Sequence, residues 1–153
     1  DKLNFEFTIK VIKNLIDFNF LFIGEGEIIN KEIRNLDNLF ILDSIQHDQL
    51  INLFLDCQLL WCPFAINKLT NAMTPIKFIE ALSLGKPVLS TKIIFKDSQI
   101  KKLIKFSNSA SEHINYIKNL QYTENKEKIM DRKASVKERN WNAIMEKYYR
   151  LII

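Results

Sequence analysis

The sequence predicts an α/β fold, in which a Rossmann-like parallel sheet carries helices on both faces. Short apolar runs alternate with amphipathic segments along most of the 153 residues. The runs are apolar at consecutive positions, which is typical of parallel strands that are buried on both faces. Helices between such strands imply right-handed crossovers, so that all strand C-termini share one edge of the sheet. Ligands of these folds bind at that edge.

The expected elements follow one another in a regular order. Strands are expected at the apolar runs of residues 18–23, 39–42, 59–62, 88–89 and 104–106. Apolar residues at helical spacing indicate helices at residues 3–17, 28–34, 47–57 and 74–85, and again from 110 to 153. Residues 67–73 read as a polar loop. Gly24-Glu25-Gly26, Asp43-Ser44 and Ser90-Thr91 directly follow strands, so we expect them to cluster at the shared edge.

Length and composition indicate one folded domain. The chain is 47% hydrophobic and 26% charged, which excludes wholesale disorder. A net charge of +4 suits an anionic ligand or an anionic membrane surface but falls short of the dense basic patches of a nucleic-acid binder. No apolar run approaches the ~18 residues of a membrane span, and no signal peptide is seen. The expected location is the cytoplasm, with the inner face of the membrane left open.

Cysteines and histidines give no sign of a metal centre. Cys57 and Cys62 lie in apolar surroundings, which favours two buried reduced thiols over a disulfide. With only His47 and His113 beside them, no zinc-like ligand spacing exists, and no metal is expected. His47 precedes a helix and is expected to be exposed, and His113 is expected on the solvated face of a polar helix.

The helix at residues 74–85 begins with an unexpected charge. Thr74 is a natural N-cap, and Pro75 follows at the first helical position. Gly85 can take the left-handed conformation that ends a helix, and Pro87 prevents its continuation. Lys77 places a positive charge in the first turn, where the macrodipole and the free N–H groups favour an anion.

Two explanations of this lysine remain open from the residues alone. Lys77 and Glu80 lie three residues apart and could pair with each other, which stabilises a helix by only ~0.2–0.5 kcal/mol. Alternatively, Lys77 and the helix start could bind a phosphate, while Glu80 accepts hydrogen bonds from two sugar hydroxyls. A phosphate beside a diol describes a nucleotide.

Residues 74–88, TPIKFIEALSLGKPV, resemble the signature P-x-K-x-x-E-x-x-x-x-G-K-P-V of glycosyltransferases with the two-domain GT-B fold. The signature belongs to their C-terminal, nucleotide-sugar-binding domain. Weaker resemblances in the same order lie at residues 20–26, 38–43, 60–64 and 139–141. The resemblance therefore covers nearly the whole chain. It implies that residues 1–153 are a single donor-binding domain, the C-terminal half of a GT-B fold of the bacterial polysaccharide or capsule type, without its N-terminal acceptor domain.

The resemblance implies a set of residues that bind the donor. Glu80 would bind the ribose and Lys77 the diphosphate, while the Asp43–Ile45 loop would approach the base, and residues 67–73 would face the donor sugar or pyrophosphate. For Gly24 and Gly26, close approach of the backbone to the ligand and a tight turn without ligand contact are equally open. The substrate-binding residues expected are Lys77, Glu80, Thr74, Pro75, Gly24, Gly26, Asp43, Ser44 and Ile45.

The implied function is transfer of a hexosyl-type sugar from a UDP- or GDP-sugar to a polysaccharide or lipid-linked acceptor, without a cofactor or metal. Catalytic residues are unassigned because the base of such enzymes commonly lies on the N-terminal domain, so the chain alone is expected to be inactive. Its partners would be the nucleotide-sugar, the N-terminal domain and a peripheral membrane surface, but not nucleic acid.

Two departures from the family pattern limit this interpretation. Many retaining members carry a second glutamate eight residues before the ribose-binding one, where this chain has Ala72, so a retaining mechanism is not carried over. The family's opening strand, with its basic phosphate-binding residues, is expected upstream of Asp1. Two other hypotheses therefore stay open: a non-catalytic α/β nucleotide- or phosphate-binding module, and a protein-interaction domain with a vestigial cleft.

Overall fold

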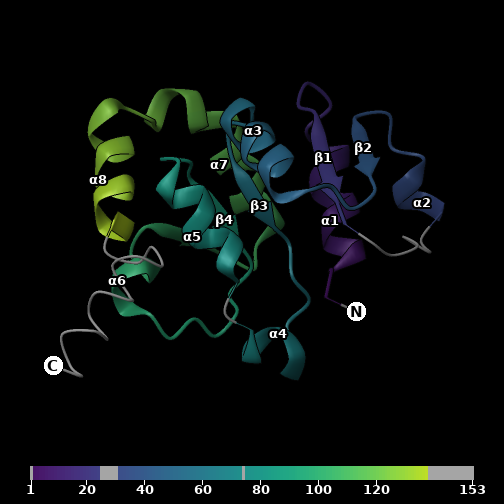
Figure 1. Cartoon of the computed structure of the whole chain (residues 1–153). Coiled ribbons are helices and arrows are strands. Elements are labelled where there is room, and N and C mark those ends of the chain that lie inside the picture. Colours follow the sequence, from purple (N-terminus) through teal and green to yellow (C-terminus); the bar gives the residue numbers. More distant parts are fainter. Residues whose placement is uncertain (1, 25–30, 74, 138–153) are drawn as a thin grey trace, which may run out of the picture.

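The computed structural model describes residues 2–24, 31–73 and 75–137 (Figure 1). The strands are β1 (Phe20–Ile23), β2 (Leu39–Leu42), β3 (Leu60–Cys62), β4 (Val88–Ser90) and β5 (Ile104–Phe106). The helices are α1 (Phe5–Lys13), α2 (Lys31–Arg34), α3 (His47–Asp56), α4 (Lys68–Ala72), α5 (Ile76–Ser83), α6 (Ser98–Lys101), α7 (Ala110–Thr123) and α8 (Lys126–Val136). Helices and strands alternate along most of these ranges, but α6 was not expected, and the single helix expected from residue 110 is divided into α7 and α8. The fold is therefore α/β, and all described strand pairs are parallel.

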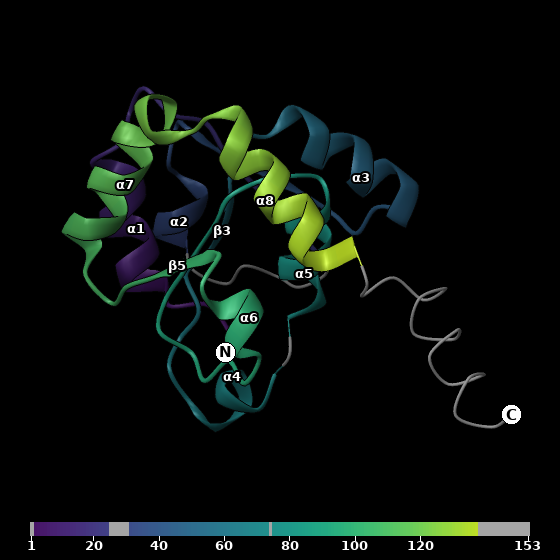
Figure 2. The same cartoon turned by 90° about the vertical axis from the view of Figure 1, so that its left-hand side faces the viewer.

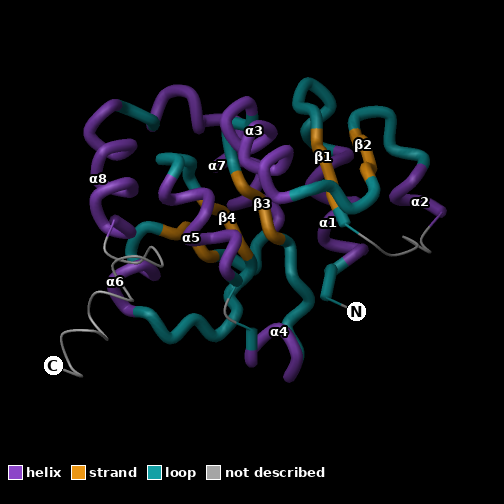
Figure 3. The backbone as a smooth tube through the Cα atoms, viewed as in Figure 1, coloured by secondary structure: helices purple, strands orange, loops and turns teal. Residues whose placement is uncertain are grey.

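The strands form two small sheets instead of the single sheet expected. β1 pairs with β2, and β4 lies between β3 and β5 (Figure 3). Within the described ranges no backbone ladder joins β1 to β3. The ring of Trp61 in β3 instead lies 5.2 Å from that of Phe20 and 6.2 Å from that of Phe22, both in β1. β3 is only three residues long. Just past its end, Phe64 forms an isolated antiparallel bridge with Leu3, which precedes α1.

Helices cover both faces of the three-stranded sheet, as the sequence predicts. Val88 of β4 packs into a core with Phe78 of α5, whereas the next residue, Leu89, packs with Ile12 of α1 and Ile117 of α7. Successive side chains of a strand point to opposite faces. One face is therefore covered by α1 and α7 and the other by α5, α6 and α8, and the turned view shows the helices on either side of the strands (Figure 2).

The C-terminal end of α5 is built as the glycine and proline pattern predicts. Leu84 is the C-cap, and Gly85 follows with φ of +79°. Gly85 donates its N–H to Leu82 O at 2.9 Å, and Lys86 donates its N–H to Ala81 O at 2.8 Å. This pair of bonds is the Schellman motif, which satisfies carbonyls that a helix end leaves open.

α8 packs against that end of α5 and fixes its position. The buried side chain of Arg132 donates from Nε to Gly85 O at 2.8 Å, and its other nitrogens bind the carboxylate of Glu124. A cation beside the last carbonyls of a helix also complements the macrodipole. Residues 139–141, which carry one of the weaker parts of the family resemblance, lie outside the described residues.

His113 is fully buried, so the expectation that it would be solvated is wrong. Its Nδ1 accepts the Trp61 Nε1–H at 2.9 Å, and its Nε2 lies 2.8 Å from Ser107 O. Because an indole nitrogen can only donate, the imidazole proton resides on Nε2, which donates to that carbonyl. Burial lowers the pKa of His113 and keeps the ring neutral. The sequence missed this because a histidine on a polar helix gives no sign of a half-buried tryptophan 52 residues away.

Candidate functional site

The strand ends are level within each sheet, as expected for parallel strands. Ile23 is in register with Leu42, and Cys62 is in register with Ser90, which in turn pairs with Phe106. The segments that follow the strands therefore emerge on the same edge of each sheet. Figure 1 shows α4 and the start of α5 on this side of the three-stranded sheet.

The start of α5 differs from the expectation by one residue. Pro75 is the N-cap rather than the first helical residue, and its carbonyl accepts the Phe78 N–H at 3.0 Å. Proline offers no side-chain acceptor, and no side chain of the described residues caps this end. Thr74, the predicted cap, lies outside the described residues. The first turn thus begins with backbone donors that no described side chain satisfies.

Lys77 and Glu80 pair with each other across one turn of α5. Lys77 Nζ lies 2.9 Å from Glu80 Oε2, and the side chains are 45% and 22% exposed. The contact is an ion pair by distance but not a hydrogen bond by geometry, because Oε2 is a buried atom without a hydrogen-bond partner. The self-contained pair that the sequence left open is thus formed. Such i,i+3 pairs contribute only about 0.2–0.5 kcal/mol.

His47 lies next to this pair, which the sequence reasoning missed. Its Nδ1 is 4.0 Å from Glu80 Oε1, and its side chain is 64% exposed, so the expectation of exposure is confirmed. α3 is also tied at its other end to the chain just after α5, where Lys86 Nζ donates to Leu55 O at 2.7 Å. The available signal was topological: in a parallel α/β fold, helices that follow β2 and β3 both begin at the carboxyl edge.

The other predicted site residues are only partly brought together. Gly24 has φ of +151°, and a Cβ there would meet no atom within 4 Å, while Gly26 lies outside the described residues. Asp43 and Ser44 are exposed and Ile45 is half-buried, in the segment just before α3. No hydrogen bond or ion pair among the described residues links these three to Lys77 or Glu80.

Residues 67–73, predicted as a loop, contain the short helix α4. Asn67 Oδ1 accepts the Thr70 N–H at 3.0 Å, and Thr70 Oγ1 accepts the Asn67 N–H at 3.1 Å. This reciprocal capping box explains why a polar stretch forms a helical turn. Asn71 Oδ1 then accepts the Ile94 N–H at 3.1 Å, which ties α4 to the segment after β4. Ala72, where retaining family members carry a glutamate, is exposed at the end of α4.

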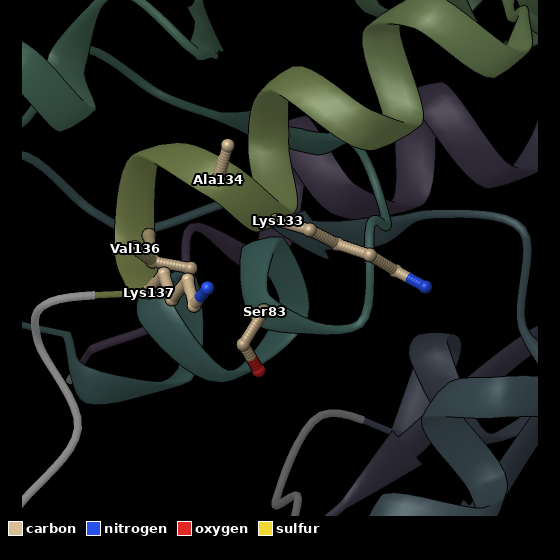
Figure 4. Close-up of a pocket in the computed structure, with 5 residues that line it drawn as sticks. All are labelled: Ser83, Lys133, Ala134, Val136 and Lys137. Carbon is tan, nitrogen blue, oxygen red and sulfur yellow. The ribbon is translucent and has the colours of Figure 1, made fainter. Parts of the chain in front are cut away.

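A hollow of about 340 Å³ lies between α5 and α8, away from Lys77 and Glu80. Figure 4 shows Ser83 of α5 facing the last turn of α8 and the residue that follows it. Its lining residues are Ser83, Lys133, Ala134, Val136 and Lys137. None of the predicted site residues contributes to this hollow.

The described ranges contain no group of three or more His, Cys, Asp or Glu side chains that could hold a metal ion. Cys57 and Cys62 are free thiols, as expected, but both residues are half-buried rather than buried. In the same ranges no helix combines the length and the apolarity needed to cross a membrane. Comparison with protein-family models and with curated proteins finds no match for this chain.

Proposed function

We propose that this chain is the nucleotide-sugar-binding domain of a GT-B-type glycosyltransferase. In that function Lys77 and the start of α5 would bind the diphosphate, and Glu80 would bind the ribose. The observation that carries the proposal is the placement of these two residues together, on one helix that starts at the carboxyl edge of a parallel sheet. Ligands of open α/β sheets bind outside that edge.

The internal pair of Lys77 with Glu80 does not oppose this function. A half-exposed pair contributes about 0.2–0.5 kcal/mol, whereas a charge-assisted hydrogen bond contributes about 1.5–3 kcal/mol. A phosphate at Lys77 would therefore replace a weak partner with a strong one. The N–H groups of Ile76 and Lys77 precede the first backbone bond of α5, from Phe78 N–H to Pro75 O, and would supply further donors to the same anion.

The mechanism of transfer would be electrostatic where this chain contributes to it. As the bond from the anomeric carbon to the diphosphate breaks, negative charge develops on the leaving diphosphate. Lys77 and the helix start would stabilise that charge in place. Glu80, by holding the ribose, would fix the distance between the diphosphate and the acceptor. The base that activates the acceptor is not assigned to any residue of this chain.

The test is calorimetric titration of the chain with UDP, GDP and their sugars, with pyrophosphate as a further probe. Lys77→Ala should weaken the binding of nucleoside diphosphate by about 10- to 100-fold, the equivalent of about 1.5–3 kcal/mol. Glu80→Gln should weaken nucleotide binding but not pyrophosphate binding. Matched controls are Lys126→Ala and Glu127→Ala, which change exposed residues of α8.

Three results would change the assignment. The assignment of the site to α5 is wrong if no nucleoside diphosphate binds, or if Lys77→Ala and Glu80→Gln both bind the nucleotide as tightly as the wild type does. If pyrophosphate binds as tightly as the nucleotides, the chain is a phosphate-binding module instead. If the chain alone transfers sugar, the expectation that a second domain is required is wrong.

A further inference from the structure

The imidazole of His47 faces the carboxylate that we propose for the ribose. Its Nδ1 lies 4.0 Å from Glu80 Oε1, and it reaches that position from a different helix, α3. We propose that His47 is a specificity-determining residue, which holds one ribose hydroxyl together with Glu80 and so selects ribonucleotides over 2′-deoxyribonucleotides. This inference rests on the proposed function, because it assigns a further residue to the same site.

The separation of the two side chains suits one hydroxyl group. At 4.0 Å the imidazole and the carboxylate are too far apart to share a hydrogen bond, so a ligand would break no bond between them. A hydroxyl oxygen placed about 2.7–2.8 Å from both His47 Nδ1 and Glu80 Oε1 would see these two atoms at an angle of about 90–95°. A hydroxyl has one hydrogen to donate and lone pairs to accept with. It can therefore donate to Glu80 Oε1 and accept the N–H of His47.

The two carboxylate oxygens of Glu80 have different neighbours. Oε2 is buried and lies 2.9 Å from Lys77 Nζ, whereas Oε1 is the oxygen nearer to His47. Lys77 thus orients the carboxylate from one side of α5, and Oε1 remains for the ligand. A ribose hydroxyl would meet one acceptor, Oε1 of Glu80, and one ring nitrogen of His47. A 2′-deoxy sugar has a hydrogen atom in place of that hydroxyl and can make neither hydrogen bond.

The backbone of α3 holds His47 in this position. Its last turn is bound to the chain after α5 through Lys86 Nζ and Leu55 O, at 2.7 Å. His47 is the first residue of α3, directly after the segment of residues 43–45 that the sequence predicts near the base. A ribose lies between the base and the diphosphate of a nucleotide. His47 follows that segment in the chain and lies beside Glu80, whose other oxygen lies beside Lys77.

The experiment compares a nucleotide with its 2′-deoxy analogue. The probe is whichever of UDP, GDP, ADP and CDP binds the wild-type chain most tightly by calorimetry. His47→Ala should weaken binding of that ribonucleotide by about 3- to 10-fold, the range expected for one hydrogen bond. It should leave the affinity for the 2′-deoxy analogue unchanged, so that the preference for ribose falls by the same factor.

Ile51→Ala is the matched control, because Ile51 is an exposed residue of the same helix and should leave both affinities unchanged. If His47→Ala weakens the ribonucleotide and the deoxynucleotide equally, or neither, the role of His47 is refuted while the proposed function stands. If none of the four diphosphates binds the wild-type chain, the proposed function fails, and the role of His47 fails with it.

Discussion

Gly85 should tolerate alanine poorly, for two separable reasons. Its φ of +79° lies in the left-handed region, where an L residue costs about 1–2 kcal/mol. An added Cβ would also lie 2.7 Å from Ile129 Cγ2, and overpacking of this kind costs about 1–3 kcal/mol. The second neighbour, Lys133 Cε at 3.0 Å, is part of a flexible side chain and can move. Gly85→Ala should therefore lower the free energy of unfolding by about 2–5 kcal/mol.

Urea denaturation followed by circular dichroism measures this loss, provided that the slope with urea is unchanged. In an Ile129→Ala background the steric contribution disappears, so Gly85→Ala should there cost only the backbone contribution of about 1–2 kcal/mol. Gly24→Ala is the matched control for the steric contribution alone, because a Cβ at Gly24 meets no atom within 4 Å, while its φ of +151° keeps a backbone cost. An equal cost of Gly85→Ala in both backgrounds would refute the steric argument, and a cost below about 1 kcal/mol would refute the backbone argument.

Two further predictions concern buried titratable groups. Burial lowers the pKa of His113 below its ordinary 6.5, so its contribution to stability is complete above that pH and is lost as the pH falls through the folded-state pKa. Between about pH 8 and 5 the urea midpoint of the wild type should fall towards acidic pH more than that of His113→Gln. Parallel pH profiles of the two proteins would contradict this. Burial also raises the pKa of Cys62 to about 12, so iodoacetamide should leave Cys62 unmodified in the folded chain and label it after unfolding in urea. Rapid labelling of Cys62 in the folded chain would show that the thiol is accessible.

Local patterns in the sequence predicted most of the elements but not how the strands assemble. Gly85 and Pro87 mark the end of α5 because they act through their own backbone geometry. The runs at β1, β2 and β3 are apolar at every position, which identifies them as strands from composition alone. The division into two sheets depends instead on contacts between distant parts of the chain. Trp61 of β3 packs on Phe20 of β1, and Phe64 after β3 pairs with Leu3 before α1. Apolar patterning identifies a strand but does not specify its neighbour.

The candidate site was predictable to the extent that it lies on one helix. Lys77 and Glu80 share α5, so their spacing alone places them one turn apart. Whether they pair with each other or bind a ligand stayed open, because a spacing of three residues at a helix start suits both. Topology places the start of α3 at the same edge as α5, but the 4.0 Å approach of His47 to Glu80 depends on how the two helices pack, which the sequence does not specify.

The division of the sheet affects the cooperativity of the domain. A backbone ladder between β1 and β3 would make the two sheets one hydrogen-bonded unit, but side-chain packing around Trp61 joins them instead. Such a boundary is where cooperative opening units of a native protein separate, so amide exchange should report β1–β2 and β3–β5 as distinct units. The segment of residues 43–45 belongs to the first unit and α5 to the second. A nucleotide bound across both would therefore couple their opening, and would slow exchange in each.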